Sequence, residues 1–257
     1  SEMCIRDRYR KEFFVPSDFE GRKIRLEFDG LDAFATVWLN NELVGKHNNM
    51  FVPCSFEVTE LIKRGENNIL TVRLASPIKA VADKDVSKLT KSFNPERFYA
   101  RKSQISYGWD IGVRVVTIGI WRGVRLVALN DMEIEDVSVR TRSRRDGKAA
   151  LTFYLDINNY TNSLQEAEIE LQAQHRDSSL EDSLSVELKP GGNKVIMEEL
   201  LDNPHLWWPN RLGEQNLYTL EIRINKDAKT IDSHSLRFGI REIALIQEPQ
   251  GDGKISF

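Results

Sequence analysis

The chain has 257 residues, and its 36 Lys and Arg against 39 Asp and Glu give a net charge of −3 at pH 7. Hydrophobic residues make up 40% and charged residues 29%, a composition typical of globular proteins and not of disordered ones. The slight acidic excess argues against a nucleic-acid surface, which is usually basic. Since no run approaches the roughly 18 apolar residues that span a bilayer, we expect neither a nucleic acid nor a membrane as a partner.

The first half of the chain alternates polar and apolar residues with a period of two, the pattern of half-buried β-strands. Alternation begins near Tyr9, and Asn40-Asn41 predicts a tight hairpin turn. Residues 79–102 are charged and carry Pro95, so we expect a long loop there with a short helix or two. The strand-like segments are 24–28, 35–39, 42–45, 69–74, 115–120 and 124–129.

After Asn130 the alternation returns in segments that turn residues separate. These segments are 134–140, 149–158, 165–175, 184–188 and 218–224. Regularly spaced strands with few helices are typical of β-sandwiches and not of parallel α/β units. We therefore predict an all-β protein with two domains that divide near Asn130. The second domain has room for a seven-stranded sandwich.

Both ends of the sequence look interrupted. Residues 1–8 do not share the period-two alternation that starts near Tyr9, and they lack the basic, apolar and small-residue order of a signal peptide. Either these residues are an artefactual leader, or the chain begins inside a larger gene. At the other end, residues 253–257 read as the start of a further strand.

Common catalytic and nucleotide-binding motifs are absent from the sequence, including GxSxG, the Walker loop and HExxH. Two cysteines, Cys4 and Cys54, exclude a disulfide framework. Asn159-Tyr160-Thr161 is a glycosylation sequon, which has meaning only in a secretory context. The histidines lack metal-ligand spacing, so we expect no metal. They are His47, His175, His205 and His234.

Three segments go beyond a general sandwich pattern. They contain, in chain order, Phe28-Asp29-Gly30, Trp38-Leu39-Asn40 and Asn49-Met50-Phe51; Arg101-Lys102, Gly108-Trp109-Asp110 and Trp121-Arg122; and Leu206-Trp207-Trp208-Pro209 and Phe238-Gly239-Ile240-Arg241. In this order they resemble the non-catalytic front half of family 2 glycoside hydrolases, and the first two are most similar to β-mannosidases. The resemblance covers nearly everything from Tyr9 onward. Met50 and Phe51 are expected in the core, and Trp207-Trp208 against a neighbouring domain.

The resemblance implies a jelly-roll sugar-binding domain over 9–129, with its front strands missing and its sheet edges open, and an immunoglobulin-like sandwich over 130–246. Residues 247–257 would begin the connection to a (β/α)₈ barrel, which packs against both domains. In the family the barrel carries the two glutamates of retaining hydrolysis. A barrel needs about 250 residues of its own. We therefore expect this chain to hold no catalytic residue and to be inactive by itself.

The resemblance singles out Asp110 as a substrate-binding residue. In β-mannosidases the aspartate of the Gly-Trp-Asp motif reaches the mouth of the barrel and contacts the terminal sugar. A carboxylate suits this role because it can accept hydrogen bonds from two vicinal hydroxyls. Trp109 offers an apolar face to a sugar ring, and Arg101 completes the candidate site. The alternative is that Asp110 caps a turn and Trp109 fills the sandwich core.

Three cations flank Asp110, namely Arg101, Lys102 and Arg114. Either one of them pairs with Asp110 and orients it, or the three form a solvated basic patch. Two nearby residues depart from the family's pattern: Ile111 stands where relatives usually have a second tryptophan, and Val113 where they usually have proline. These departures bear on substrate preference more than on fold.

The leading hypothesis is that the chain is the front portion of a retaining exo-β-mannosidase, without the catalytic groups. The parent enzyme would remove terminal non-reducing β-D-mannose from β-mannoside oligosaccharides and would need no cofactor. Within the family, a β-galactosidase or a β-glucuronidase parent is the nearest alternative. A stand-alone carbohydrate-binding or adhesion module with an exposed aromatic platform is the alternative from another class.

Overall fold

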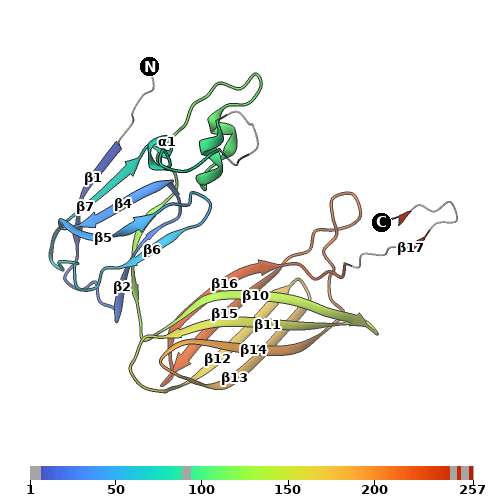
Figure 1. The fold of residues 1–257 in the computed structure, drawn as a ribbon. Helices are drawn as coiled ribbons and strands as arrows, with labels where there is room; N and C mark the ends of the chain where they lie inside the picture. The colour runs from blue at the N-terminus through green and yellow to red at the C-terminus, as the bar shows by residue number, and fades with distance from the viewer. Residues whose placement is uncertain (1–6, 88, 90–93, 244–247, 250–254, 257) are drawn as a thin grey trace. The chain divides into compact units, whose positions relative to one another are not determined.

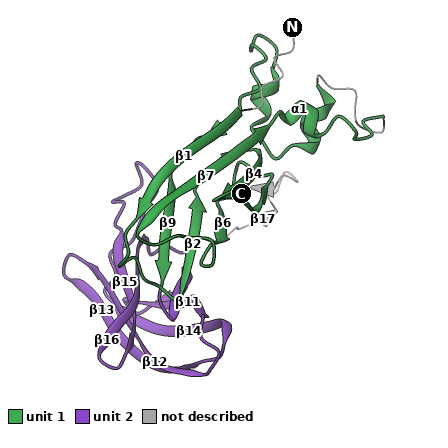
Figure 2. Ribbon diagram, turned by 90° about the vertical axis from the view of Figure 1, so that its left-hand side faces the viewer, with its two compact units in different colours: residues 1–129 green, residues 130–257 purple. Residues whose placement is uncertain are grey.

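The computed structural model describes residues 7–87, 89, 94–243, 248–249 and 255–256. The chain divides into two compact units, residues 1–129 and 130–257 (Figure 2). Strands dominate both units, so the predicted all-β class is confirmed (Figure 1). Within the part of the chain that the structure describes, no helix is long and apolar enough to cross a bilayer.

Two antiparallel sheets form the main part of the first unit. One sheet has the order β1-β7-β4-β5, with β1 (Asp7–Val15), β7 (Glu66–Ala75), β4 (Phe34–Leu39) and β5 (Glu42–His47). The other has the order β6-β2-β9, with β6 (Cys54–Glu57), β2 (Lys23–Phe28) and β9 (Val124–Leu129). A short pair joins β3 (Leu31–Asp32) to β8 (Gly119–Ile120).

Alternate residues of the two sheets share one core, as the period-two pattern predicts. Strand β2 buries Ile24, Leu26 and Phe28, which pack in the same cluster as Val37 of β4 and Val72 of β7. In β2 and β7 the buried residues are therefore two positions apart, and this alternation fixes the register of each sheet.

The hairpin between β4 and β5 turns at Asn40-Asn41, as predicted. Both residues have left-handed backbones, with φ of 52° and 73°, which suits the two-residue turns of β-hairpins. The Asn40 amide also donates to the Leu61 carbonyl at 2.8 Å, and its oxygen accepts from the Ile69 N–H at 2.9 Å. The turn is thus tied to the loop that precedes β7.

Strands β1 and β9 stand at the ends of their sheets. A groove of about 560 Å³ lies beside them, and its lining is mostly apolar. The apolar lining includes Tyr9 and Phe13 of β1, Leu70 and Val72 of β7, and Val124 and Leu126 of β9. Part of the core face of this unit is therefore open along its strand edges.

Two strand boundaries in the first unit differ from those expected. Strand β1 begins at Asp7, inside the proposed leader 1–8; residues 1–6 lie outside the described residues. The strand expected over 115–120 shortens to β8, because the Thr117 N–H donates to the Val115 carbonyl at 3.0 Å and so turns the backbone locally.

Short helices lie between β7 and β8, and the first two of them overlap residues 79–102, where a short helix or two was expected. They are α1 (Pro77–Ala80), η1 (Pro95–Tyr99) and η2 (Gln104–Tyr107), and residues 88 and 90–93 lie outside the described residues. The last helix leads directly into the loop of the candidate site.

Seven antiparallel strands build residues 130–243 of the second unit, which confirms the predicted strand number. One sheet is β10-β11-β14, with β10 (Met132–Arg145), β11 (Lys148–Asn159) and β14 (Gly191–Asp202). The other is β13-β12-β15-β16, with β13 (Ser178–Leu188), β12 (Gln165–His175), β15 (Tyr218–Lys226) and β16 (Lys229–Phe238). Their inward residues form a single core around Phe153, Leu171 and Ile222.

Two features complete the second unit. Asn159 of the sequon is 2% exposed, and its amide donates to the carbonyls of Ser163 and Leu188, each at 2.9 Å, so it is a structural residue of the core edge. Beyond it, β17 (Glu248–Pro249) pairs with β18 (Ile255–Ser256). The other residues of the expected connection 247–257 lie outside the described residues.

Candidate functional site

Two of the predicted substrate-binding residues, Trp109 and Asp110, lie in one long loop of the first unit, between η2 and β8, and the third, Arg101, lies just before η2. Trp109 and Gly112 form an isolated antiparallel bridge, and the Gly112 N–H donates to the Trp109 carbonyl. Asp110 and Ile111 thus occupy the tip of a tight turn. A Cβ at Gly108, whose φ is 92°, would meet Cβ of Arg114 at 3.3 Å, so the two legs of the loop lie against each other.

Asp110 is exposed at this tip. Among the described residues, no hydrogen bond or ion pair engages its carboxylate. Both of its oxygens can therefore accept hydrogen bonds from a ligand. Asp110 is therefore not buried, and its carboxylate is accessible to a sugar hydroxyl.

Trp109 is 59% exposed, so it does not fill the sandwich core. The Arg97 guanidinium lies 5.9 Å from the centroid of its ring and 5.2 Å from that of Phe98. This cation–π contact holds the indole beside Asp110 while much of the side chain stays open to solvent.

Two of the cations that flank Asp110 in sequence have other partners. Lys102 is buried and pairs with Asp32, and Arg114 donates to Asn94 Oδ1 at 2.5 Å and to Glu96 Oε1 at 2.8 Å. Neither of them forms an ion pair with Asp110. The basic-patch alternative fails for Lys102 as well, because its side chain is 0% exposed.

Arg101, the third cation, has an exposed side chain and an anchored backbone. Its carbonyl accepts from the Met50 N–H at 2.9 Å, next to a parallel bridge between Arg101 and Asn49. Within the described residues its guanidinium makes no contact with Asp110. The loop therefore brings Trp109 and Asp110 together and leaves Arg101 at its base.

A set of apolar side chains in this loop and in segments before it in the first unit is exposed to solvent, which periodicity alone did not reveal. Ile111 is 98% exposed and Val113 81%. Phe51 is 62% exposed, so its expected place in the core was wrong. The other members are Phe98, Ile105 and Val115.

Trp207 and Trp208 of the second unit have different surroundings. Trp207 bridges to Gln215, and the Arg241 guanidinium lies 5.0 Å from the centroid of its ring. Trp208 is 43% exposed, and Leu212 near it in sequence is 70% exposed. Only the second tryptophan of the pair thus offers a broad apolar face to solvent.

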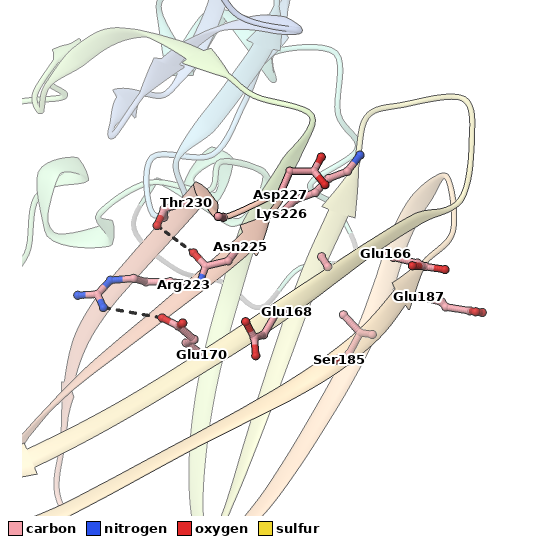
Figure 3. Close-up of a pocket in the computed structure, with 13 residues that line it drawn as sticks. Glu166, Glu168, Glu170, Ser185, Glu187, Arg223, Asn225, Lys226, Asp227 and Thr230 are labelled. Carbon is pink, nitrogen blue, oxygen red and sulfur yellow. Dashed lines mark hydrogen bonds and ion pairs between the residues drawn. The ribbon is translucent and has the colours of Figure 1, made fainter.

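A hollow of about 890 Å³ lies on the outer face of the β13-β12-β15-β16 sheet (Figure 3). Three of its carboxylates, Glu166, Glu168 and Glu170, are outward residues of β12, and Arg223 approaches Glu170 at 4.0 Å. Outward residues two positions apart are separated by roughly 6 to 7 Å along a strand. Consistent with this spacing, no three His, Cys, Asp or Glu among the described residues could hold a metal ion.

His175 and His205 come together although 30 positions separate them, which the sequence did not indicate. Their ring centroids are 5.5 Å apart, and His175 contacts Asn216 Oδ1 at 3.1 Å. His205 contacts Asp177 Oδ1 at 2.7 Å, which lowers the pKa of that carboxyl. These contacts fasten the ends of β12 and β15 and indicate a structural corner.

Two family models match the two units. Residues 6–122 match the glycosyl hydrolase 2 galactose-binding domain-like model, and residues 132–241 match the model of glycosyl hydrolases family 2. Among curated relatives, β-mannosidase B of Aspergillus clavatus is 30% identical over 255 residues, which are 97% of this chain and 30% of the relative. β-Mannosidase B of Aspergillus oryzae is 30% identical over 260 residues. The chain thus spans about 30% of the length of these relatives.

Solved structures agree with these matches. A β-D-mannosidase from Dictyoglomus thermophilum superposes with a TM-score of 0.87 and 33% identity, over 97% of this chain and 31% of that one. A putative β-galactosidase from Bacteroides fragilis has a TM-score of 0.73 at 22% identity, over 98% of this chain and 35% of that one, which shows a common fold. The chain therefore belongs to glycoside hydrolase family 2, and it comprises a galactose-binding-like jelly roll followed by an immunoglobulin-like sandwich, as the sequence predicted.

Proposed function

We propose that this chain is the non-catalytic front portion of a retaining β-mannosidase and that its first unit shapes the subsite for the terminal sugar. The observation that carries the proposal is the exposed pair at the loop tip, where the carboxylate of Asp110 is available beside the indole of Trp109. Its support from relatives is the similarity of 30–33% to β-mannosidases over nearly the whole chain.

The two side chains suit a hexose in different ways. Asp110 accepts hydrogen bonds from two vicinal hydroxyls, and such charge-assisted bonds are among the stronger ones in proteins. Trp109 packs against the apolar face of the ring. Arg101 at the base of the loop adds a donor for a more distant hydroxyl. Bond cleavage belongs to the barrel, whose two glutamates act as acid/base and nucleophile.

The barrel would pack against both units. The apolar side chains around the loop tip support this in the first unit, since Ile111 and Val113 are almost fully exposed. Trp208 and Leu212 support it in the second. The open groove beside β1 and β9 would receive the further jelly-roll strands that the family resemblance implies.

The test is hydrolysis of an aryl β-mannoside by the longer protein that carries the barrel. Each hydrogen bond to a charged group is worth about 1.5 to 3 kcal/mol, so Asp110→Asn should lower kcat/KM by roughly 10- to 100-fold. Asp146→Asn is the matched control, because Asp146 is also an exposed aspartate with positive φ, in a turn of the second unit. An unchanged kcat/KM in Asp110→Asn, or turnover by the 257-residue chain alone, would overturn the proposal.

The exposed Trp109 also favours the second candidate, a stand-alone carbohydrate-binding module, which needs an aromatic platform. Calorimetric titration of the chain with mannose and mannobiose separates the two functions. A Kd below about 1 mM would favour the module, because half of a subsite should bind a sugar very weakly. A panel of aryl mannosides, galactosides and glucuronides distinguishes the possible parents.

A further inference from the structure

A buried ion pair lies beneath the loop that carries Trp109 and Asp110. The ammonium of Lys102 contacts Asp32 Oδ2, and the two side chains are 0% and 7% exposed. The other oxygen, Asp32 Oδ1, is buried and has no hydrogen-bond partner among the described residues. Removing two charges from water is costly, and in some proteins a buried pair of this kind fixes a specific arrangement of the chain.

Thr117 joins this pair from the other side of the loop. Lys102 Nζ donates to Thr117 Oγ1 at 3.1 Å, and Thr117 Oγ1 donates to Asp32 Oδ2 at 3.2 Å. Lys102 immediately precedes the segment 103–116, and Thr117 immediately follows it. The three side chains therefore close the base of this segment.

Strand pairing anchors the same base. Asp32 lies in β3, where it pairs with Gly119 of β8, two residues after Thr117. The carboxylate that holds both ends of the loop is thus fixed to the sandwich by its own backbone. Tyr107 within the loop is fully buried, and burial, Glu96 and Asp32 raise its pKa to about 12.

We infer that Lys102, Asp32 and Thr117 form a clasp that closes segment 103–116 at its base and thereby positions Asp110. The inference rests on the proposed function of Asp110. The three residues are positioning residues, since Lys102 and Asp32 are buried and act on the ligand only through the loop. Without the clasp, the exposed tip would sample more conformations and would meet a sugar hydroxyl less often.

Hydrogen exchange of the 257-residue chain tests the clasp without any substrate. Thr117→Val removes the hydroxyl and keeps the side-chain shape, and since Thr117 is an exposed residue the fold should survive. We expect amide exchange in 104–116 to rise about 10-fold, while the amides of β4 and β7 keep their rates. Thr117→Ser retains the hydroxyl and should restore slow exchange. Equal exchange in Thr117→Val and the unchanged chain would overturn the clasp.

A double variant probes the ion pair itself. Lys102→Met with Asp32→Leu replaces both charges by apolar groups, a change that buried pairs often tolerate. Lys148→Met with Asp202→Leu is the control, since that exposed pair at 2.9 Å lies far from the loop in sequence. Faster exchange confined to 104–116 in the first pair supports the clasp, and loop exchange equal to the control contradicts it. If the variant with Lys102→Met and Asp32→Leu does not fold, amide exchange in Thr117→Val is the test of the clasp.

Kinetics of the barrel-bearing protein separate this inference from the function on which it rests. Thr117→Val should raise KM and lower kcat/KM about 10-fold, with recovery in Thr117→Ser. If Asp110→Asn leaves kcat/KM unchanged, the proposed function is wrong. The clasp is then still tested by amide hydrogen exchange of 104–116 in Thr117→Val. If Asp110→Asn is impaired and Thr117→Val is equal to the unchanged protein in exchange and kinetics, the clasp alone is wrong.

Discussion

Gly30 lies directly against the indole of Trp121: a Cβ at residue 30 would sit 2.5 Å from Nε1 and 2.7 Å from Cε2 of that ring. The backbone N–H of Trp121 also donates to the Gly30 carbonyl at 3.2 Å, and the Arg122 guanidinium lies 4.2 Å from the centroid of the indole ring. Contact between the two segments therefore depends on a residue without a side chain.

Gly30→Ala should accordingly destabilise the first unit, because the added methyl must displace the indole or the backbone. We expect a loss of about 1 to 3 kcal/mol in the free energy of unfolding, measured by urea denaturation. Gly192→Ala is the control, since a Cβ there meets nothing within 4 Å. Equal stability of the two variants would contradict the close contact.

Asn159→Ala should destabilise the second unit although it removes a sequon. The Asn159 amide donates to the carbonyls of Ser163 and Leu188, the second of which is buried, and its oxygen accepts from the Thr161 N–H at 2.9 Å. Leaving such groups unpaired costs about 2 to 4 kcal/mol in total. Asn193→Ala removes comparable bonds at an exposed turn and should cost less than about 1 kcal/mol. The measurement is the shift of the thermal midpoint in each variant.

Tyr107 should make the first unit sensitive to strong alkali. Burial is the largest cause that raises its pKa from 10.0 to about 12, so the folded state keeps the phenol protonated where the unfolded state loses the proton. The contribution to stability is full below pH 10 and is lost as the pH rises through 12, by roughly 2 to 3 kcal/mol. Urea denaturation between pH 9 and 12 should show this fall, and Tyr107→Phe should flatten it.

Cys54 should react slowly with alkylating reagents in the folded chain. Burial raises the pKa of its thiol from 9.0 to about 11, so little thiolate is present near neutral pH. Labelling by iodoacetamide at pH 8, followed by peptide mass spectrometry, should modify Cys54 much faster in urea than in buffer. Equal rates in the two conditions would show that this thiol is not shielded.

Periodicity predicted most strands because half-buried strands show their inward face in the sequence. The segment 165–175 coincides with β12, where Ile169 and Leu171 alternate with glutamates. Strands β14 and β16 were not identified, because glycines and polar residues occupy more than half of the positions of each strand and most positions are exposed or only half-buried. Segment 115–120 has the right residues for a strand, but one local hydrogen bond outweighed their propensity.

The candidate site could be predicted only in part. The family resemblance led to Trp109 and Asp110, and the structure adds that both are exposed at one turn. Lys102 stood in the sequence as one cation of a basic cluster, whereas it pairs with a carboxylate 70 positions earlier. Periodicity does not reveal such distant partners, because a buried ion pair depends on which segments of the chain the fold brings together.

The uncovered edge at β1 has a consequence for how copies of this chain meet. Arg8, Arg10 and Lys11 are all exposed along that strand and outnumber its one exposed acidic residue, Glu12. If two molecules aligned these edges antiparallel, each would set its cations opposite those of the other, and repulsion would oppose further hydrogen bonding between them. The same charges would favour pairing with a strand rich in glutamate or aspartate. The edge therefore disfavours self-association of this chain through β1 and favours an acidic strand as its partner.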